Sequence, residues 1–350
     1  MATRHRPSPH EQLTSAETPA TMRAVVQDRY GGPDVLAVAD VPRPVAGEGE
    51  VLVRVEAASV NARDWHIMRG EPRVARLMGR SIFGWRAPKV RVRGTDYAGV
   101  IEAVGPQVQD WAVGDRVFGE ASATLAEFVA APVTAMARIP NGVTMEQAAA
   151  VPLAATTAWE CLRAANAAPN ARTLIVGASG GVGTFLIQLA RSLGLHVTAV
   201  CSARNAEQAR ALGASKVIDY AQEDFTQLEA AYDLVIDLVG NRPLAELQRV
   251  ATPAGSVVLS GGRVPGEGRI VGAVALLIRA QVARRRGGPL LHTPQAVPTH
   301  GSLEVLADLM RAGVLRAQIE RTFDLEGAAT ALEHLETEHA RAKVLVVCRR

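Results

Sequence analysis

The sequence predicts an α/β chain in which a barrel-like β domain precedes a doubly wound parallel sheet. Two patterns carry this prediction. From residue 22 to about 139, short alternating segments are separated by turns rich in Gly and Pro, as in a small β-barrel. From about residue 141, apolar strands alternate with amphipathic helices, which indicates parallel strands covered by helices on both faces.

The first half is interpreted as a set of short strands. The segment "EVLVRVEAASV" alternates so that Val51, Val53 and Val55 share one apolar face. The loop before it, residues 40–50, is rich in Pro and Gly and separates it from the strand "MRAVVQ". Further strands are expected over 97–105, 114–120 and 125–132.

The second half predicts a longer series of alternating elements. Helices are expected within 144–166, 181–193, 205–212 and 243–250, and strands over 173–177, 196–201, 216–219, 233–239 and 255–260. Residues 301–350 add a helix, a strand, a second helix and a closing strand, "AKVLVVC". These final strands are expected to return to the β domain or to its junction with the second domain.

Composition favours a soluble globular protein. Hydrophobic residues make up 48% and charged residues 21%, and a net charge of +3 is too weak to predict nucleic-acid binding. The most apolar run, residues 270–283, is shorter than the ~20 residues of a spanning helix. Residues 1–21 are polar and contain three prolines, which favours a disordered tail over a transit peptide. Three widely spaced cysteines predict no disulfide framework, so a cytoplasmic location is expected.

A glycine-rich turn joins the first strand of the second half to its helix, in "LIVGASGGVGTFLIQLARSLG" at 174–194. A strand, a glycine turn and a helix N-terminus together present free N–H groups and a positive dipole to a pyrophosphate. The first position of G-x-G-x-x-G is Ala178 here, and a tight turn without a ligand is the alternative. The residues expected to hold a dinucleotide are Ser179, Gly180, Gly181, Val182 and Gly183.

With these motifs in order, the chain resembles the zinc-free quinone oxidoreductases of the medium-chain dehydrogenase/reductase superfamily, of the ζ-crystallin and reticulon-interacting type. The resemblance covers about residues 22–348 and rests on "EVLVRVEAASVNARDWHIMRG", "GTDYAGVIEAVG", "GDRVFG", "AAAVPLAATTAW", "GASGGVGTF", "GASKVIDY" and "EHARAKVLVV". It implies a GroES-like β-barrel catalytic domain over 22–140, completed by about 300–350, and a Rossmann cofactor domain over 141–299.

The end of the second Rossmann strand predicts the cofactor. Ser202 stands where an NAD site has an acidic residue, and Arg204 follows it. A hydroxyl and a nearby guanidinium suit a 2′-phosphate, so NADPH is expected; the alternative is a solvated arginine before the next helix. The resemblance adds Tyr220 and Arg341, with His339 and Ala340 beside the latter. Four residues follow later strands, where ligands lie in such sheets: Gly240, Asn241, Ser260 and Gly261.

No metal site is predicted. By motif alignment, the catalytic zinc ligands of the superfamily fall on Asn61, Thr95 and Leu153, none of which is a good zinc ligand. The four-cysteine structural zinc loop is absent, and the eight histidines are scattered along the chain.

Without a Lewis acid, hydride transfer needs an acceptor that is already electrophilic, which points to a quinone or an α,β-unsaturated carbonyl. Asn61 is expected to contact the substrate or the nicotinamide, and Thr157 to lie beside the nicotinamide. Expected pocket walls are Asp64, Trp65, His66 and Tyr97. Asp64 could instead cap a helical turn, and Trp65 and Tyr97 could simply pack. No acid–base pair stands out, so water is the expected proton source.

The segment 268–291 differs most from the family. It is interpreted either as an amphipathic helix over the cleft, ending in arginines at 284–286, or as a lid that contacts a membrane surface. A homodimer is expected through an edge strand of the Rossmann sheet, "SVVLSGG". The alternative function is an NADPH-binding sensor or RNA-binding crystallin-like protein; its only support is the arginine cluster, so no nucleic-acid partner is expected.

Overall fold

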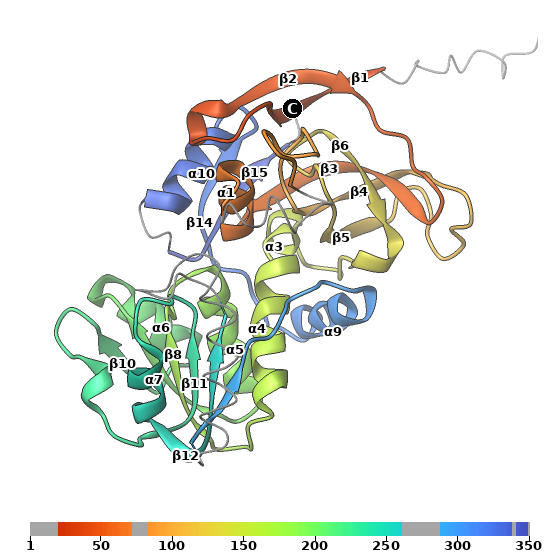
Figure 1. The fold of residues 1–350 in the computed structure, drawn as a ribbon. Helices are drawn as coiled ribbons and strands as arrows, with labels where there is room; N and C mark the ends of the chain where they lie inside the picture. The colour runs from red at the N-terminus through yellow and green to blue at the C-terminus, as the bar shows by residue number, and fades with distance from the viewer. Residues whose placement is uncertain (1–19, 72–82, 261–287, 338–340, 349–350) are drawn as a thin grey trace, which may run out of the picture.

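The computed structural model describes residues 20–71, 83–260, 288–337 and 341–348. These residues form two lobes, one built around an antiparallel-rich sheet and the other around a parallel sheet (Figure 1). Helices α3 (Met145–Ala149) and α4 (Pro152–Ala165) run between the lobes. The α/β class is therefore confirmed, with a GroES-like domain and a Rossmann-like parallel sheet.

The first lobe holds a seven-stranded sheet in the order β14-β15-β3-β4-β5-β7, with β6 paired to β3 and a separate β1–β2 hairpin. Its apolar side includes Val51, Val53 and Val55, as the alternation predicts. The elements are β1 (Thr21–Gln27), β2 (Leu36–Pro42), β3 (Glu50–Val60), α1 (Ala62–Arg69), β4 (Asp96–Val104), β5 (Arg116–Glu120), β6 (Phe128–Pro132), β7 (Met136–Arg138), β14 (Ile319–Asp324), α10 (Ala328–Thr337) and β15 (Lys343–Val347).

The second lobe holds six parallel strands in the order β10-β9-β8-β11-β12-β13. The strand order reverses between β8 and β11, and ligands of open α/β sheets bind at such a point. The elements are β8 (Arg172–Val176), α5 (Gly181–Ser192), β9 (His196–Cys201), α6 (Ala206–Leu212), β10 (Lys216–Asp219), β11 (Tyr232–Asp237), α7 (Leu244–Val250), β12 (Ala251–Leu259) and β13 (Leu290–His292). Helix α9 (His300–Arg311) packs against β7 of the first lobe and against α4.

Strand alternation gives this parallel sheet two apolar faces. Ile175 of β8 packs in the cluster that holds Leu186 of α5, and Val176 packs in the opposite cluster with Leu247 of α7. All four side chains are buried. The sheet is therefore covered on both sides, as the continuous apolar strands indicate.

One expectation about the sheet is wrong. The segment "SVVLSGG" was expected at the edge, but β12 pairs with β13 on its outer side, with Ser256 opposite Leu290. In the described part of the chain, β13 is the end strand. Three residues are too few for a periodic pattern, so sequence alternation could not show this strand.

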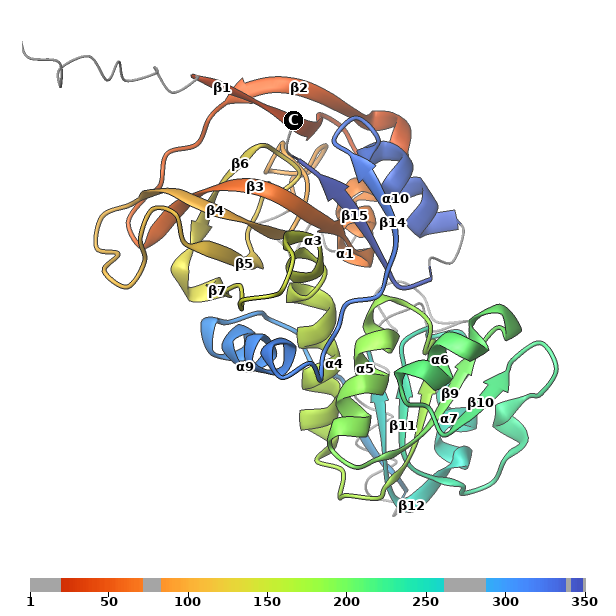
Figure 2. The same ribbon diagram turned by 180° about the vertical axis from the view of Figure 1, so that it is seen from behind.

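The C-terminal segment returns to the first lobe and touches both lobes. β15 lies antiparallel to β3 with Val344 opposite Val60, and Figure 2 shows β14 and α10 next to β15. One residue before β15, the backbone N–H of Ala342 donates to the carbonyl of Ser179, 2.8 Å away, in the glycine-rich turn. The end of the chain therefore connects the cofactor turn to the barrel.

Several features named in the sequence lie outside the described residues: most of the tail 1–21, the apolar run 270–283, most of the segment 268–291, and Gly261, His339 and Ala340. Within the described ranges, no helix combines the length and apolar character needed to cross a membrane.

Candidate active and cofactor-binding site

The glycine-rich turn has the geometry of an anion site. Gly180 is the N-cap of α5, and no side chain in the described ranges caps the helix, so its first N–H groups can bind a ligand. A Cβ on Gly183 would lie 2.4 Å from the carbonyl oxygen of Gly177, so this helix packs too closely on the strand for any side chain. Ser179 and Val182 are half-buried beside these glycines. The cradle therefore fits a dinucleotide pyrophosphate.

The residues predicted for the 2′-phosphate gather at the end of β9. Ser202 is half-buried, and Arg204 lies exposed two residues further on. The Nε atom of Arg341 donates to Oε1 of Gln208 on α6, 2.5 Å away. This hydrogen bond holds Arg341 beside α6, the helix that follows β9. Tyr220, 57% exposed, follows the neighbouring strand β10. Two guanidinium groups and a hydroxyl are a suitable donor set for a phosphate.

The ends of β11 and β12 hold the other predicted residues at the carboxyl edge of the parallel sheet. The Asp237 carboxylate accepts the N–H groups of Val239 and Gly240 at 2.9 and 3.0 Å, which forms a tight turn with Gly240 at φ 70°. The Ser260 N–H donates to the Asp237 carbonyl at 2.9 Å, and Asn241 is exposed nearby. These predicted residues therefore lie along the crevice where open α/β sheets bind ligands.

A buried polar network lies where β3, β4 and β15 meet. The Nδ2 atom of Asn61 donates to Oδ2 of Asp96 at 2.9 Å, and the Ser59 hydroxyl donates to the same oxygen at 3.0 Å. The Nζ atom of Lys343 donates to Oδ1 of Asn61 at 2.5 Å and lies 4.0 Å from Asp96 Oδ2. Asn61 is 8% exposed, Lys343 3% and Asp96 not at all.

This network fixes the orientation of the Asn61 amide. Lys343 is a donor only, so it must face the amide oxygen, while the Asp96 carboxylate must face the amide nitrogen. The two partners therefore determine which way the amide faces.

Asp64 is the second carboxylate of this region and caps α1. Its Oδ2 accepts the Asn61 N–H at 2.7 Å, and its Oδ1 lies 3.4 Å from the Thr95 hydroxyl. Asp64 therefore makes the capping contact, and its role as a pocket wall stays a prediction. Burial raises the pKa of Asp64 to about 6, despite the hydrogen bond from Asn61. Burial also raises the pKa of Asp96 and lowers that of Lys343.

Thr157 is linked to the network through its own helix. Its hydroxyl donates to the Leu153 carbonyl at 2.7 Å, and the Leu153 N–H lies 3.3 Å from Asp96 Oδ1. The proton of Thr157 is thus used within α4, while its oxygen can still accept a hydrogen bond. Asn61 and Thr157, the two predicted catalytic residues, are joined through Asp96.

The four predicted pocket walls divide into two groups. Trp65 and His66, both half-buried, stack with ring centroids 3.8 Å apart on α1, directly beside Asp64. Tyr97 is not brought to this place. It follows Asp96 on β4, so it points to the other side of the sheet, and it is fully buried in the barrel core with its hydroxyl 3.6 Å from Met136 Sδ. Of its two interpretations, packing is the one observed.

Sequence reasoning missed Asp96 and Lys343, the charged centre of the network. Asp96 lies within "GTDYAG", where its neighbour Tyr97 is the more conspicuous side chain. Lys343 is one of three lysines among 38 basic residues, a rarity that could have marked it.

The three positions aligned with zinc ligands also converge here. Thr95 precedes Asp96, Leu153 donates its N–H to Asp96, and Asn61 donates its amide. In the described ranges, no group of three or more His, Cys, Asp and Glu side chains could hold a metal ion.

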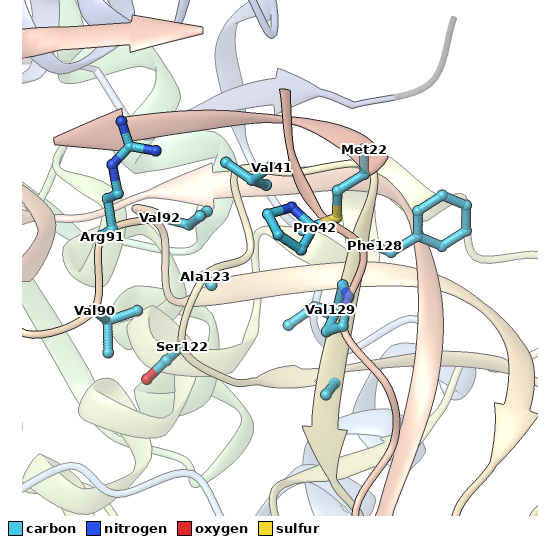
Figure 3. Close-up of a pocket in the computed structure, with 12 residues that line it drawn as sticks. Met22, Val41, Pro42, Val90, Arg91, Val92, Ser122, Ala123, Phe128 and Val129 are labelled. Atoms are coloured by element: carbon cyan, nitrogen blue, oxygen red, sulfur yellow. The ribbon is translucent and has the colours of Figure 1, made fainter. Parts of the chain in front are cut away.

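A separate apolar groove of about 430 Å³ lies in the first lobe (Figure 3). Its lining includes Met22, Val41, Pro42, Phe128 and Val129, with Arg91 at one end. It shares no residue with the polar network or with the glycine-rich turn, so it is not part of the candidate site.

Comparison with known proteins agrees with this geometry. A model of the alcohol dehydrogenase GroES-like domain matches residues 47–154, and a zinc-binding dehydrogenase model matches residues 212–346. The chain is 31% identical to a chloroplastic quinone oxidoreductase of Triphysaria versicolor, over 93% of this chain and 98% of the relative. It is 30% identical to a chloroplastic NADPH-dependent alkenal/one oxidoreductase of Arabidopsis thaliana, over 95% and 81% respectively.

Solved structures show the same fold. The quinone oxidoreductase of Coxiella burnetii superposes with a TM-score of 0.81 at 29% identity, covering 94% of this chain and all of that one. A mycobacterial protein complexed with NADPH superposes with a TM-score of 0.78 at 27% identity, covering 93% and 99%. With its GroES-like lobe, its glycine-rich turn and these relatives over nearly its full length, the chain is an oxidoreductase of the medium-chain dehydrogenase/reductase superfamily.

Proposed function

We propose that this protein transfers a hydride from NADPH to a quinone or an α,β-unsaturated carbonyl compound without using zinc. One observation carries the proposal: the segment at Ala342 and Lys343 joins the glycine-rich turn, through Ser179, to the amide of Asn61. A dinucleotide seated on the turn would thus have its reactive end directed toward the polar network. Asn61 and Thr157 lie at this network and are the residues proposed to contact nicotinamide or substrate.

The choice of NADPH rests on the end of β9. Ser202 leaves room for a 2′-phosphate, and Arg204 and Arg341 supply guanidinium donors near it. An acidic residue at position 202 would repel the phosphate, and none is present. When bound, NADPH supplies the hydride; the chain binds, orients and shields it. The mycobacterial structure with NADPH and the NADPH-dependent plant relative support this assignment.

Zinc independence rests on the chemistry of the donors. Asn61, Thr95 and Leu153 offer no thiolate or imidazole, which zinc in such sites prefers. The Asp96 carboxylate accepts hydrogen bonds from Ser59, Asn61 and Leu153 and faces the Lys343 ammonium, so its lone pairs are engaged. No Lewis acid is then available to polarise an alcohol or a simple carbonyl.

The substrate class follows from that chemistry. A quinone or enone accepts a hydride at an already electrophilic carbon, so orientation and hydrogen bonding suffice. The half-buried Trp65 and His66 beside Asp64 are the proposed pocket walls, and water is the proposed proton source. Relatives named quinone oxidoreductase and alkenal/one oxidoreductase support both substrate classes.

The test is NADPH consumption at 340 nm with 9,10-phenanthrenequinone, a panel of linear enones, and a matched panel of saturated ketones. We expect turnover with the quinone or the enones and none with the ketones. Turnover of the ketones alone would refute the substrate assignment. NADPH binding without turnover of any compound would favour the alternative of an NADPH-binding sensor.

We also propose a homodimer that continues the parallel sheet across a two-fold axis, now at β13 because β12 is internal. Leu290 of β13 is 43% exposed, which fits such an edge. The cytoplasm stays the proposed compartment, supported by three buried free cysteines, Cys161, Cys201 and Cys348.

A further inference from the structure

Lys343 is an unusual residue in this chain. Of 38 basic residues only three are lysines, at positions 89, 216 and 343. Lys89 and Lys216 are exposed, whereas Lys343 is 3% exposed. A buried ammonium loses its hydration, and lysine is almost never fully buried without a partner. The position therefore calls for a specific explanation.

Two structural features hold Lys343 in place. On one side its ammonium binds Oδ1 of Asn61 at 2.5 Å. On the other side its stem lies against the cofactor turn, because a Cβ built on Gly181 would be only 3.0 Å from Lys343 Cδ. The side chain thus reaches from the first turn of α5 to the amide of Asn61.

The backbone before Lys343 is strained in a way that supports this placement. Ala342 has φ 77°, in the left-handed region that a residue with a Cβ seldom adopts. Such a conformation is strained and persists only where surrounding contacts enforce it. Here the contacts are the Ala342 N–H to Ser179 at 2.8 Å and the bridge between Gly180 and Ala342. The turn that would hold the cofactor therefore also sets the direction of Lys343.

We infer that Lys343 is a positioning residue that transmits the state of the glycine-rich turn to the amide of Asn61. A phosphate ligand on the turn moves the first turn of α5 against the lysine stem, and the ammonium carries this movement to Asn61 Oδ1. Lys343 acts through Asn61 and does not itself need to touch substrate. The kinetic consequence of this inference rests on the proposed function, whereas the coupling between turn and amide does not.

The kinetic test is a double-mutant cycle. Lys343→Met keeps the stem and removes the ammonium, and Lys216→Met is the exposed control. With NADPH and 9,10-phenanthrenequinone, Lys343→Met should lower kcat about tenfold or more while NADPH affinity changes less than about threefold. If Lys343 acts through Asn61, adding Lys343→Met to Asn61→Ala should lower kcat no further. Independent, multiplicative losses in the double variant would overturn the inference.

The coupling is tested without turnover by NMR. The chain has six asparagines, so selective ¹⁵N-asparagine labelling gives few side-chain amide signals, and Asn61→Gln identifies that of Asn61. The probe is 2′-phospho-ADP-ribose, which has the phosphates but no nicotinamide ring. It should shift the Asn61 signal in the native chain and in Lys216→Met, and leave it unmoved in Lys343→Met. An equal shift in Lys343→Met, or none in the native chain, would contradict the coupling.

A second variant keeps the test decisive if Lys343→Met does not fold. In Gly181→Ala, the new Cβ presses on the lysine stem from the turn, and no polar group of the network is removed. It should move the Asn61 amide signal without ligand, whereas Gly301→Ala, where a Cβ meets nothing within 4 Å, should not. An unmoved signal in Gly181→Ala would contradict the inference. A native chain that shows the NMR coupling but reduces no quinone or enone would refute the proposed function alone.

Discussion

The ammonium of Lys343 lies 2.5 Å from the amide oxygen of Asn61, although 282 positions separate the two residues in the sequence. The contact exists because β15 pairs antiparallel with β3, so that Val344 lies opposite Val60 and the preceding lysine reaches Asn61. It places a buried cation beside the Asp96 carboxylate, next to the turn proposed to bind the cofactor.

NADPH binding at the glycine-rich turn should weaken when a side chain is added at Gly183, where α5 packs closest to the end of β8. In Gly183→Ala, the new Cβ would lie 2.4 Å from the Gly177 oxygen, so α5 must move away from β8. We expect NADPH affinity to fall at least about tenfold and the free energy of unfolding to fall by about 1–3 kcal/mol. Fluorescence titration and urea unfolding measure both. Gly301→Ala on α9 is the control and should change neither appreciably; equal behaviour of the two variants would contradict the close packing.

Cofactor preference should depend on the end of β9. One charge-assisted contact to a phosphate is worth about 1.5–3 kcal/mol, so the native chain should prefer NADPH over NADH by roughly ten- to a hundredfold in affinity. Arg204→Ala should weaken NADPH and leave NADH nearly unchanged, and Ser202→Asp should favour NADH. Fluorescence titration gives the dissociation constants of NADPH and NADH for the native chain and both variants. Equal native affinities, or an equal loss of both cofactors in Arg204→Ala, would show that the 2′-phosphate lies elsewhere.

Burial of Asp64 should make stability depend on pH with a definite sign. Its pKa is raised from 3.8 to about 6, so the folded state binds a proton more readily than the unfolded state does. Ionisation of Asp64 therefore leaves the free energy of unfolding unchanged below pH 3.8 and lowers it by about 3 kcal/mol above pH 6. The charged groups that act on Asp64 are Asp96, Lys343 and Arg63, with Arg93 nearby.

The variant Asp64→Asn removes this titration while keeping an acceptor oxygen for the Asn61 N–H. Its stability relative to the native chain should therefore rise as the pH increases from 4 to 7, measured by urea unfolding at several pH values. Asp34→Asn, at an exposed carboxylate beside Arg29, is the control and should show no comparable trend. A difference between Asp64→Asn and the native chain that does not vary with pH would contradict the assigned pKa.

The proposed dimer should depend on the end strand of the parallel sheet. Leu290 of β13 is 43% exposed, and Leu290→Asp would put a charge at the two-fold contact. Light scattering at micromolar concentration should give a dimer mass for the native chain and a monomer mass for this variant. Val45→Asp, at a loop residue that is 87% exposed, should stay dimeric. A monomeric native chain, or a dimeric Leu290→Asp, would exclude this interface.

The features that the sequence predicted well are local. The strand, turn and helix around residues 172–192 follow from apolar runs and from glycines that permit close packing, and they appear at nearly the expected positions. The capping contact of Asp64, which the sequence offered only as the alternative to a pocket wall, is also local, because it joins Asn61 and Asp64 three positions apart. Such features can be predicted because they depend only on residues within one turn or one strand.

The features that the sequence did not predict depend on register and on distant pairing. Alternation shows that Asp96 and Tyr97 face opposite sides of β4, but not which side holds the network and which the barrel core. Lys343 reaches Asn61 only through the pairing of β15 with β3. The short β13 has too few residues to show a period, so the sheet edge was misplaced by one strand.

Hydride transfer from NADPH to a quinone or enone without zinc should survive removal of metal from the protein. The purified chain is dialysed against a chelator, its zinc content is determined by mass spectrometry, and NADPH oxidation with 9,10-phenanthrenequinone and the enone panel is followed at 340 nm before and after. We expect well below one zinc ion per chain and unchanged turnover, with no gain when zinc is added back. Stoichiometric zinc whose removal abolishes turnover and whose return restores it would contradict the account.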